Sequence, residues 1–127
     1  MQAHFLVFVG AGLGGVLRHF LNITLGRALG TDFPWTTGLI NVSGSLAMGL
    51  LTGWLAFRGG GGLTQHTRLF FATGVLGGYT TFSTFSLETV LLVERGEVAA
   101  ALAYVAGSVL LGAFSLWAGL ALARSLT

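Results

Sequence analysis

The chain has 127 residues, of which 54% are apolar and 8% are charged. A soluble domain carries about 25% charged residues, so this composition, with a mean hydropathy of +0.84, indicates an integral membrane protein. The net charge of +2 arises from six basic and four acidic residues, which form no cluster of the kind that binds nucleic acid. Because the chain has no cysteine, disulfides and thiolate metal sites are excluded.

The apolar runs between the charges predict an all-α protein with four transmembrane helices. A helix of about 20 residues crosses the hydrocarbon core, and the alternating pattern of a β-barrel is absent. Residues 59–62 form an expected glycine link before the third helix, and residues 94–97 form a polar turn before the fourth. The expected helices, all in a single membrane domain covering residues 1–127, are residues 4–28, 35–57, 68–93 and 97–124.

The first expected helix contains a glycine pattern, Gly10, Gly12 and Gly15, that matches the dinucleotide fingerprint G-x-G-x-x-G. That fingerprint needs a preceding strand and a βαβ unit, whereas the neighbouring segments here are membrane spans, so nucleotide binding is not predicted. No nucleophile–base pair stands out, and the histidines lack metal-ligand spacing, so we expect no enzyme. Glycines in small-xxx-small spacing favour close helix packing instead: Gly10 and Gly14, Gly49 and Gly53, and Gly74 and Gly78.

Basic residues are spread almost evenly between the two sides of the expected bundle. Lys/Arg asymmetry normally sets the orientation of a membrane protein, so this weak bias would permit insertion both ways. Dual insertion would allow an antiparallel homodimer with its two-fold axis in the membrane plane, and a singly oriented protein is the alternative. Arg58, Arg68 and Arg124 lie on the side of the termini, and Arg27 and Arg95 on the other, where Arg18 can be counted as well.

Polar side chains inside the expected spans are the best indicators of function, because polar groups in lipid are costly. In the second expected helix, Asn41 and Ser45 are four residues apart and share a face, as do Tyr104 and Ser108 in the fourth. Taken alone, such residues are expected to form interhelical hydrogen bonds that hold the bundle together.

The third expected helix is predicted to be broken near its middle. Gly77 and Gly78 weaken a helix, and Thr80 and Thr81 are poor helix formers. A broken helix is tolerated in a membrane where the freed backbone is buried in protein or binds something. Exposed carbonyls at such a break are good ligands for a hard cation such as Na⁺.

After the break, Phe82 and Phe85 share a face, and Ser83 and Ser86 form an adjacent polar line. An aromatic ring has a positive edge, so ring edges together with serine hydroxyls and the Asn41 amide suit a small anion stripped of water. Since no arginine lies deep in these spans, the contacts would be weak and multiple, which favours a channel.

Three features resemble the bacterial small fluoride ion channel family (Fluc, also called CrcB): GLINVSGSLAMG at 38–49, LGGYTTFSTFSLE at 76–88, and Arg18 in the first expected helix. The resemblance covers essentially the whole chain. It implies a passive channel that exports fluoride across the cell (inner) membrane. It also implies an antiparallel dual-topology homodimer with two pores in the lipid bilayer.

The resemblance further implies roles for individual residues. Arg18 would lie at the pore vestibule, and backbone carbonyls of Gly77 and Thr80 from both subunits would hold a structural Na⁺ at the dimer centre. The implied fluoride pore residues are Phe82, Phe85, Asn41, Ser83, Ser86, Tyr104 and Ser108.

Two alternatives stay open. A small proton-coupled exporter of the small multidrug-resistance type shares the size, span count and dual topology, but it needs a carboxylate in its first helix. This chain carries Arg18 there and no acid.

Glu88 is interpreted as a helix-end carboxylate paired locally, for example with an arginine, and a role near the pore mouth is the alternative.

Overall fold

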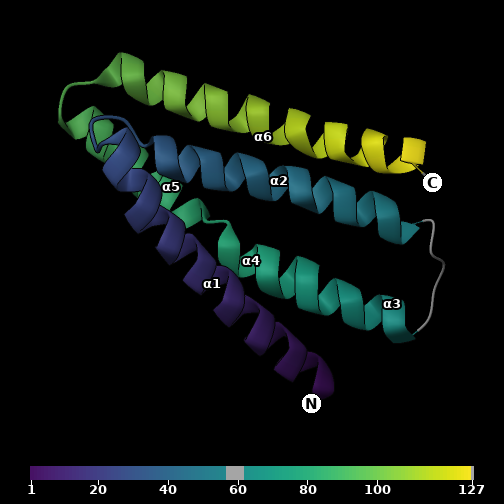
Figure 1. The fold of residues 1–127 in the computed structure, drawn as a ribbon. Helices are drawn as coiled ribbons and strands as arrows, with labels where there is room; N and C mark the ends of the chain where they lie inside the picture. The colour runs from purple at the N-terminus through teal and green to yellow at the C-terminus, as the bar shows by residue number, and fades with distance from the viewer. Residues whose placement is uncertain (57–61, 127) are drawn as a thin grey trace.

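All regular structure described in the chain is helical. The computed structural model describes residues 1–56 and 62–126, and no strand occurs in those two stretches. The expected all-α class is therefore confirmed. In chain order the elements are α1 (Gln2–Leu29), α2 (Trp35–Ala56), α3 (Gly62–Thr67), the π-helix η1 (Arg68–Leu76), α4 (Gly77–Tyr79), α5 (Phe82–Glu94) and α6 (Val98–Leu126), as Figure 1 shows.

Three helices, α1, α2 and α6, are long and apolar enough to cross a membrane. The remaining expected span corresponds to the interrupted segment from α3 to α5, so the count of four spans and the single domain stay predictions. Arg58 and residues 59–61 of the expected glycine link lie outside the described residues. Gly62, the last residue of that link, already begins α3.

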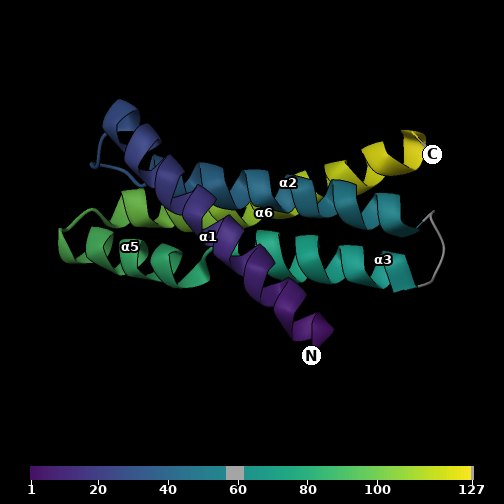
Figure 2. The same ribbon diagram turned by 60° about the horizontal axis from the view of Figure 1, so that its bottom comes forward.

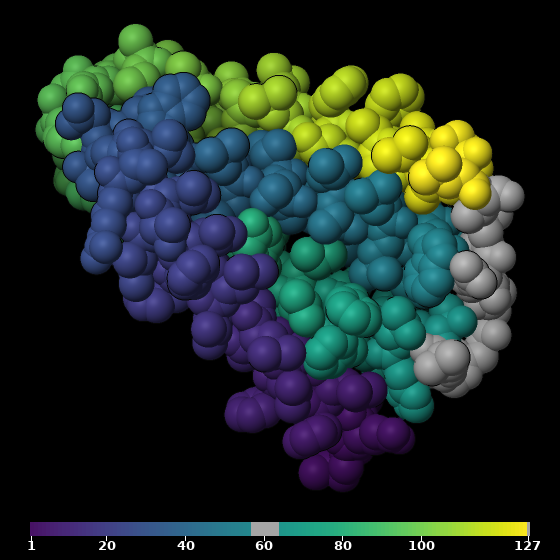
Figure 3. Space-filling model, in the orientation of Figure 1, coloured from purple at the N-terminus to yellow at the C-terminus, as the bar shows by residue number. Residues whose placement is uncertain are grey.

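The most extensive contacts among the described residues are those of α2 along α6 and of α1 across η1 and α4. Figure 2 shows α1 crossing obliquely, and in Figure 3 the atoms of α1 and η1 lie directly against each other. In both contacts the helix backbones approach so closely that only glycine fits between them. A Cβ at Gly10 would meet the backbone oxygen of Phe70, and a Cβ at Gly49 would meet that of Leu116, so the glycines at these contacts are packing residues as predicted.

The break in the third expected helix is present at Thr80 and Thr81, but the expected part of Gly77 and Gly78 in it was wrong, because both are helical. Gly77 has helical dihedral angles (φ −62°, ψ −38°), whereas Thr80 (ψ 159°) and Thr81 (φ −151°, ψ 118°) are extended. Extended backbone suits β-branched threonine. Gly78 serves helix packing instead, because a Cβ there would meet the backbone oxygen of Ala11 in α1.

The outer surface of α6 is strongly apolar. Leu110, Phe114 and Trp117 are 69%, 61% and 62% exposed. A contiguous apolar surface of this kind is rare on a soluble monomer, so it fits a helix whose outer side faces lipid.

The α1–η1 contact can be tested with a matched pair of glycine substitutions. Gly14→Ala places a Cβ against the backbone oxygen of Val75 and 2.9 Å from the Tyr79 nitrogen. Since overpacking costs about 1–3 kcal/mol, we expect a lower midpoint in thermal unfolding of the detergent-solubilised protein, followed by circular dichroism. Gly12→Ala is the control, because no neighbouring atom lies within 4 Å of its Cβ. Equal midpoints for the two variants would contradict the packing.

Candidate functional site

A partly polar groove of about 380 Å³ lies where α2, α6 and the break between α4 and α5 meet. It brings together four of the seven expected pore residues, which come from three separate helices: Asn41, Phe82, Phe85 and Ser108. Thr80 and Thr81, the two extended residues of the break, also line it. We call this feature the break groove.

Asn41 holds the break through a pair of hydrogen bonds to one residue. Its Nδ2 donates to the Thr81 carbonyl oxygen at 3.0 Å, and its Oδ1 accepts from the Thr81 backbone N–H at 2.8 Å. Backbone groups without partners are strongly disfavoured in hydrocarbon. The amide of Asn41 therefore supplies an acceptor for the Thr81 N–H, which has lost its helical partner, and adds a donor to the Thr81 carbonyl.

Thr81 then starts α5. Its hydroxyl accepts a hydrogen bond from the Thr84 backbone N–H at 3.2 Å, which is the geometry of a helix N-cap. The same hydroxyl lies 3.1 Å from Thr84 Oγ1 and 3.5 Å from Ser83 Oγ. Because a helix N-terminus carries a partial positive charge, α5 presents that charge beside Thr81 in the break groove.

The two phenylalanines continue into a row of rings. The Phe82 and Phe85 ring centroids are 5.7 Å apart, and those of Phe85 and Tyr104 are 5.0 Å apart. Phe82 is 79% exposed in the single chain, whereas Tyr104 is buried. The row therefore runs from an open surface at Phe82 into the core at Tyr104.

Tyr104 does not line the break groove but stands behind it. Its hydroxyl donates to Glu88 Oε1 at 3.1 Å, so Glu88 has the local partner that was expected, although this partner is a tyrosine. Arg95 has other contacts: its Nη2 lies 2.9 Å from the Asp32 carbonyl oxygen and 2.7 Å from Glu97 Oε2. Tyr104 thus connects the phenylalanine row to the Glu88 carboxylate.

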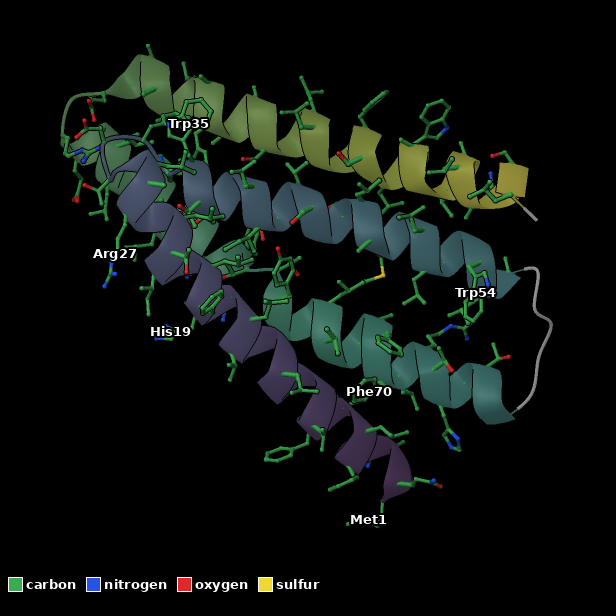
Figure 4. The ribbon with its side chains drawn as sticks, in the orientation of Figure 1. Met1, His19, Arg27, Trp35, Trp54 and Phe70 are labelled. Carbon is green, nitrogen blue, oxygen red and sulfur yellow. The ribbon has the colours of Figure 1, made fainter. Side chains whose placement is uncertain are left out.

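Three other expected site residues lie outside the break groove. Ser83 is exposed, and the Ser86 hydroxyl donates to the Phe82 carbonyl oxygen at 3.0 Å. Arg18 is half-buried on α1 and does not line the groove. In Figure 4, His19 and Arg27 on the same helix point away from the bundle. The break groove of a single chain is therefore lined by only some of the expected pore residues.

Two carbonyls at the break lose the donors that a continuous helix would provide. The Thr81 N–H, which would donate to the Gly77 carbonyl, donates to Asn41 instead. The Thr84 N–H, which would donate to the Thr80 carbonyl, donates to the Thr81 hydroxyl. Residues 1–56 and 62–126 hold no cluster of three or more His, Cys, Asp or Glu side chains that could hold a metal ion.

The Asn41–Thr81 contact can be tested by Asn41→Ala. The substitution removes both hydrogen bonds, and leaving part-buried polar groups unsatisfied costs about 1–3 kcal/mol, so we expect a lower unfolding midpoint in detergent. Ser43→Ala is the control on the same helix, because its exposed hydroxyl bonds only to the Ile40 carbonyl and Tyr79 hydroxyl among the contacts described. If both variants unfold at the same midpoint, Asn41 does not support the break.

Known proteins match this chain over nearly its whole length. The family described as CrcB-like protein, Camphor Resistance (CrcB), matches residues 5–120. A protein of Rhodopseudomonas palustris (strain BisB5) named fluoride-specific ion channel FluC is 59% identical over 126 residues, covering 99% of this chain and all of the relative. One of Nitrobacter hamburgensis named fluoride-specific ion channel FluC 2 is 60% identical over 124 residues, covering 98% of each chain. With its apolar spans, the chain therefore belongs to the CrcB-like family and is a multi-pass protein of the inner (plasma) membrane.

Proposed function

We propose that the chain is a passive fluoride-selective channel that exports fluoride across the cytoplasmic membrane, with no enzymatic activity. The relatives named as fluoride-specific ion channels support the choice of ion. The observation that carries the proposal is the break groove, which combines the Asn41 amide, the Phe82 and Phe85 rings and the Ser108 hydroxyl beside a helix N-terminus.

These groups suit a small dehydrated anion. The Asn41 Nδ2 has two N–H groups; one donates to Thr81, and the other can donate to an ion. The hydroxyl of Ser108 and the positive edges of the two rings add further weak contacts. Because no arginine or lysine lines the groove, binding is weak enough for an ion to leave again, as conduction requires. Ser83, Ser86 and Tyr104 extend the path in the proposal, and Arg18 draws anions to its vestibule.

The groove needs a second copy of the chain. Polar groups open to hydrocarbon are costly, yet the break groove is open in the single chain and Phe82 beside it is 79% exposed. A second copy packed over this face shields the polar groups and completes one path for each chain. The nearly even distribution of arginines favours an antiparallel, dual-topology homodimer of four-span chains with two pores.

A structural Na⁺ at the centre of this dimer fits the backbone. The carbonyls of Gly77 and Thr80 are those whose helical donors are diverted to Asn41 and Thr81. Carbonyl oxygens are preferred ligands of hard cations, and carbonyls of unwound membrane helices coordinate Na⁺. The bound ion would tie the two breaks together, whereas the fluoride contacts belong to the side chains.

Fluoride efflux from proteoliposomes tests the function. We expect passive fluoride efflux and no comparable chloride efflux. Phe82→Ile and Phe85→Ile should each lower fluoride efflux about tenfold or more, which corresponds to about 1.4 kcal/mol in the barrier, without preventing dimer assembly. Phe114→Ile, at a 61% exposed position on α6, is the matched control and should leave efflux unchanged. Absence of fluoride efflux in the unmodified protein would overturn the proposal, and full efflux in both variants would remove the rings from the mechanism.

The Na⁺ site is tested by thermal unfolding of the detergent-solubilised dimer in NaCl and in choline chloride of equal ionic strength. A ligand that binds only the folded state stabilises it by about 2.7 kcal/mol at 100 times its Kd. The unfolding midpoint should therefore rise with Na⁺ and, above the Kd, keep rising with the logarithm of the Na⁺ concentration. A midpoint that is the same in both salts argues against a bound Na⁺.

A further inference from the structure

A second groove, of about 310 Å³, lies between α2 and α6 and is separate from the break groove. Apolar side chains and two glycines make up most of its wall, and we call it the outer groove. Tyr104 and Ser108 line it together with Trp35, Leu39, Gly107 and Leu111. Ser108 also lines the break groove, so this residue borders both grooves.

The outer groove exists because α2 and α6 separate toward one end. They meet closely where a Cβ at Gly53 would lie 2.7 Å from Ala123 Cβ and a Cβ at Gly119 would lie 2.6 Å from the Leu46 oxygen. At the other end, a Cβ at Gly107 meets nothing within 4 Å, and one at Gly38 meets only Tyr104 Cε1 at 3.9 Å. These last two glycines are therefore not required for helix contact, and their missing side chains leave the groove open.

Water is a poor occupant of this space. A buried water needs two to four polar partners, but the wall is apolar except for two hydroxyls, and that of Tyr104 donates to Glu88. A second copy of the chain is also a poor occupant. A two-fold dimer uses one self-complementary patch on each chain, and the polar break groove is the surface that needs protein to cover it.

We propose that the outer groove binds one acyl chain of a bilayer phospholipid. The chain is a membrane protein, so lipid tails surround α2 and α6 wherever protein does not. Trp35 lies at the first residue of α2, beside α6 (Figure 4), where an amphipathic ring suits the membrane interface. In this proposal the acyl chain enters the outer groove past Trp35. It fills the space beside Gly38 and Gly107 and contacts the ring of Tyr104.

Quenching of Trp35 fluorescence by brominated lipid tests this site. The full chain carrying Trp54→Phe and Trp117→Phe is reconstituted in dioleoylphosphatidylcholine vesicles with increasing dibrominated dioleoylphosphatidylcholine. Trp35 should be quenched. Gly107→Leu fills the groove beside the ring, and because quenching needs close contact, about half or more of it should be lost.

The matched control is Ala106→Leu, which adds a side chain of the same size at the neighbouring, exposed residue outside the groove. It should leave the quenching unchanged. Gly38→Leu should reproduce the loss if Gly107→Leu does not fold. Equal quenching in the groove variants and the control, or no quenching of Trp35 in the unmodified background, overturns the proposal.

Native mass spectrometry of the unmodified chain released from the same vesicles gives an independent readout. One retained phospholipid per chain, lost in Gly107→Leu or Gly38→Leu, supports the site, and no retained phospholipid overturns it. Neither readout depends on fluoride transport, so the lipid site and the channel function succeed or fail separately.

Discussion

The structure depends on one paired contact, between the side-chain amide of Asn41 and the backbone of Thr81. A membrane helix can stop only where its unpaired backbone groups find partners, because lipid offers none. Asn41 supplies a donor and an acceptor to the same residue, much as a neighbouring strand would. Without such a partner, an interruption at Thr80 and Thr81 would leave polar groups in hydrocarbon.

Several other features follow from this contact. Because the Thr81 N–H is taken by Asn41, the Gly77 carbonyl loses its helical donor. Because the Thr81 hydroxyl caps α5, Phe82 begins a new helix and its ring lies beside the same groove. The Asn41 amide thus supports the break and diverts the donor of the Gly77 carbonyl, and the Thr81 hydroxyl starts the helix that places the Phe82 ring.

The sequence predicts the helical class well, because this depends on local composition. It also predicts that the Phe82 and Phe85 rings lie close together on one face, because this depends on their spacing. It also predicts the break near Thr80 and Thr81, but it wrongly includes the glycine pair in it. Propensity marks Gly77 and Gly78 as weak helix residues, yet contact with α1 keeps Gly78 inside a helix, and the chain opens at Thr80 instead. The partner of Asn41 lies 40 residues away along the chain, so no local pattern could identify it. The tyrosine partner of Glu88, 16 residues further along the chain, was missed for the same reason.

Tyr104 shows why a tyrosine is needed behind the break groove. Its ring contacts Phe85 and also lines the apolar outer groove, while its hydroxyl donates to Glu88. A phenylalanine would satisfy the apolar neighbours but leave Glu88 without this donor. A shorter hydroxyl residue would not fill the wall. An amphipathic ring meets both requirements, because it packs against apolar neighbours and at the same time donates to the Glu88 carboxylate.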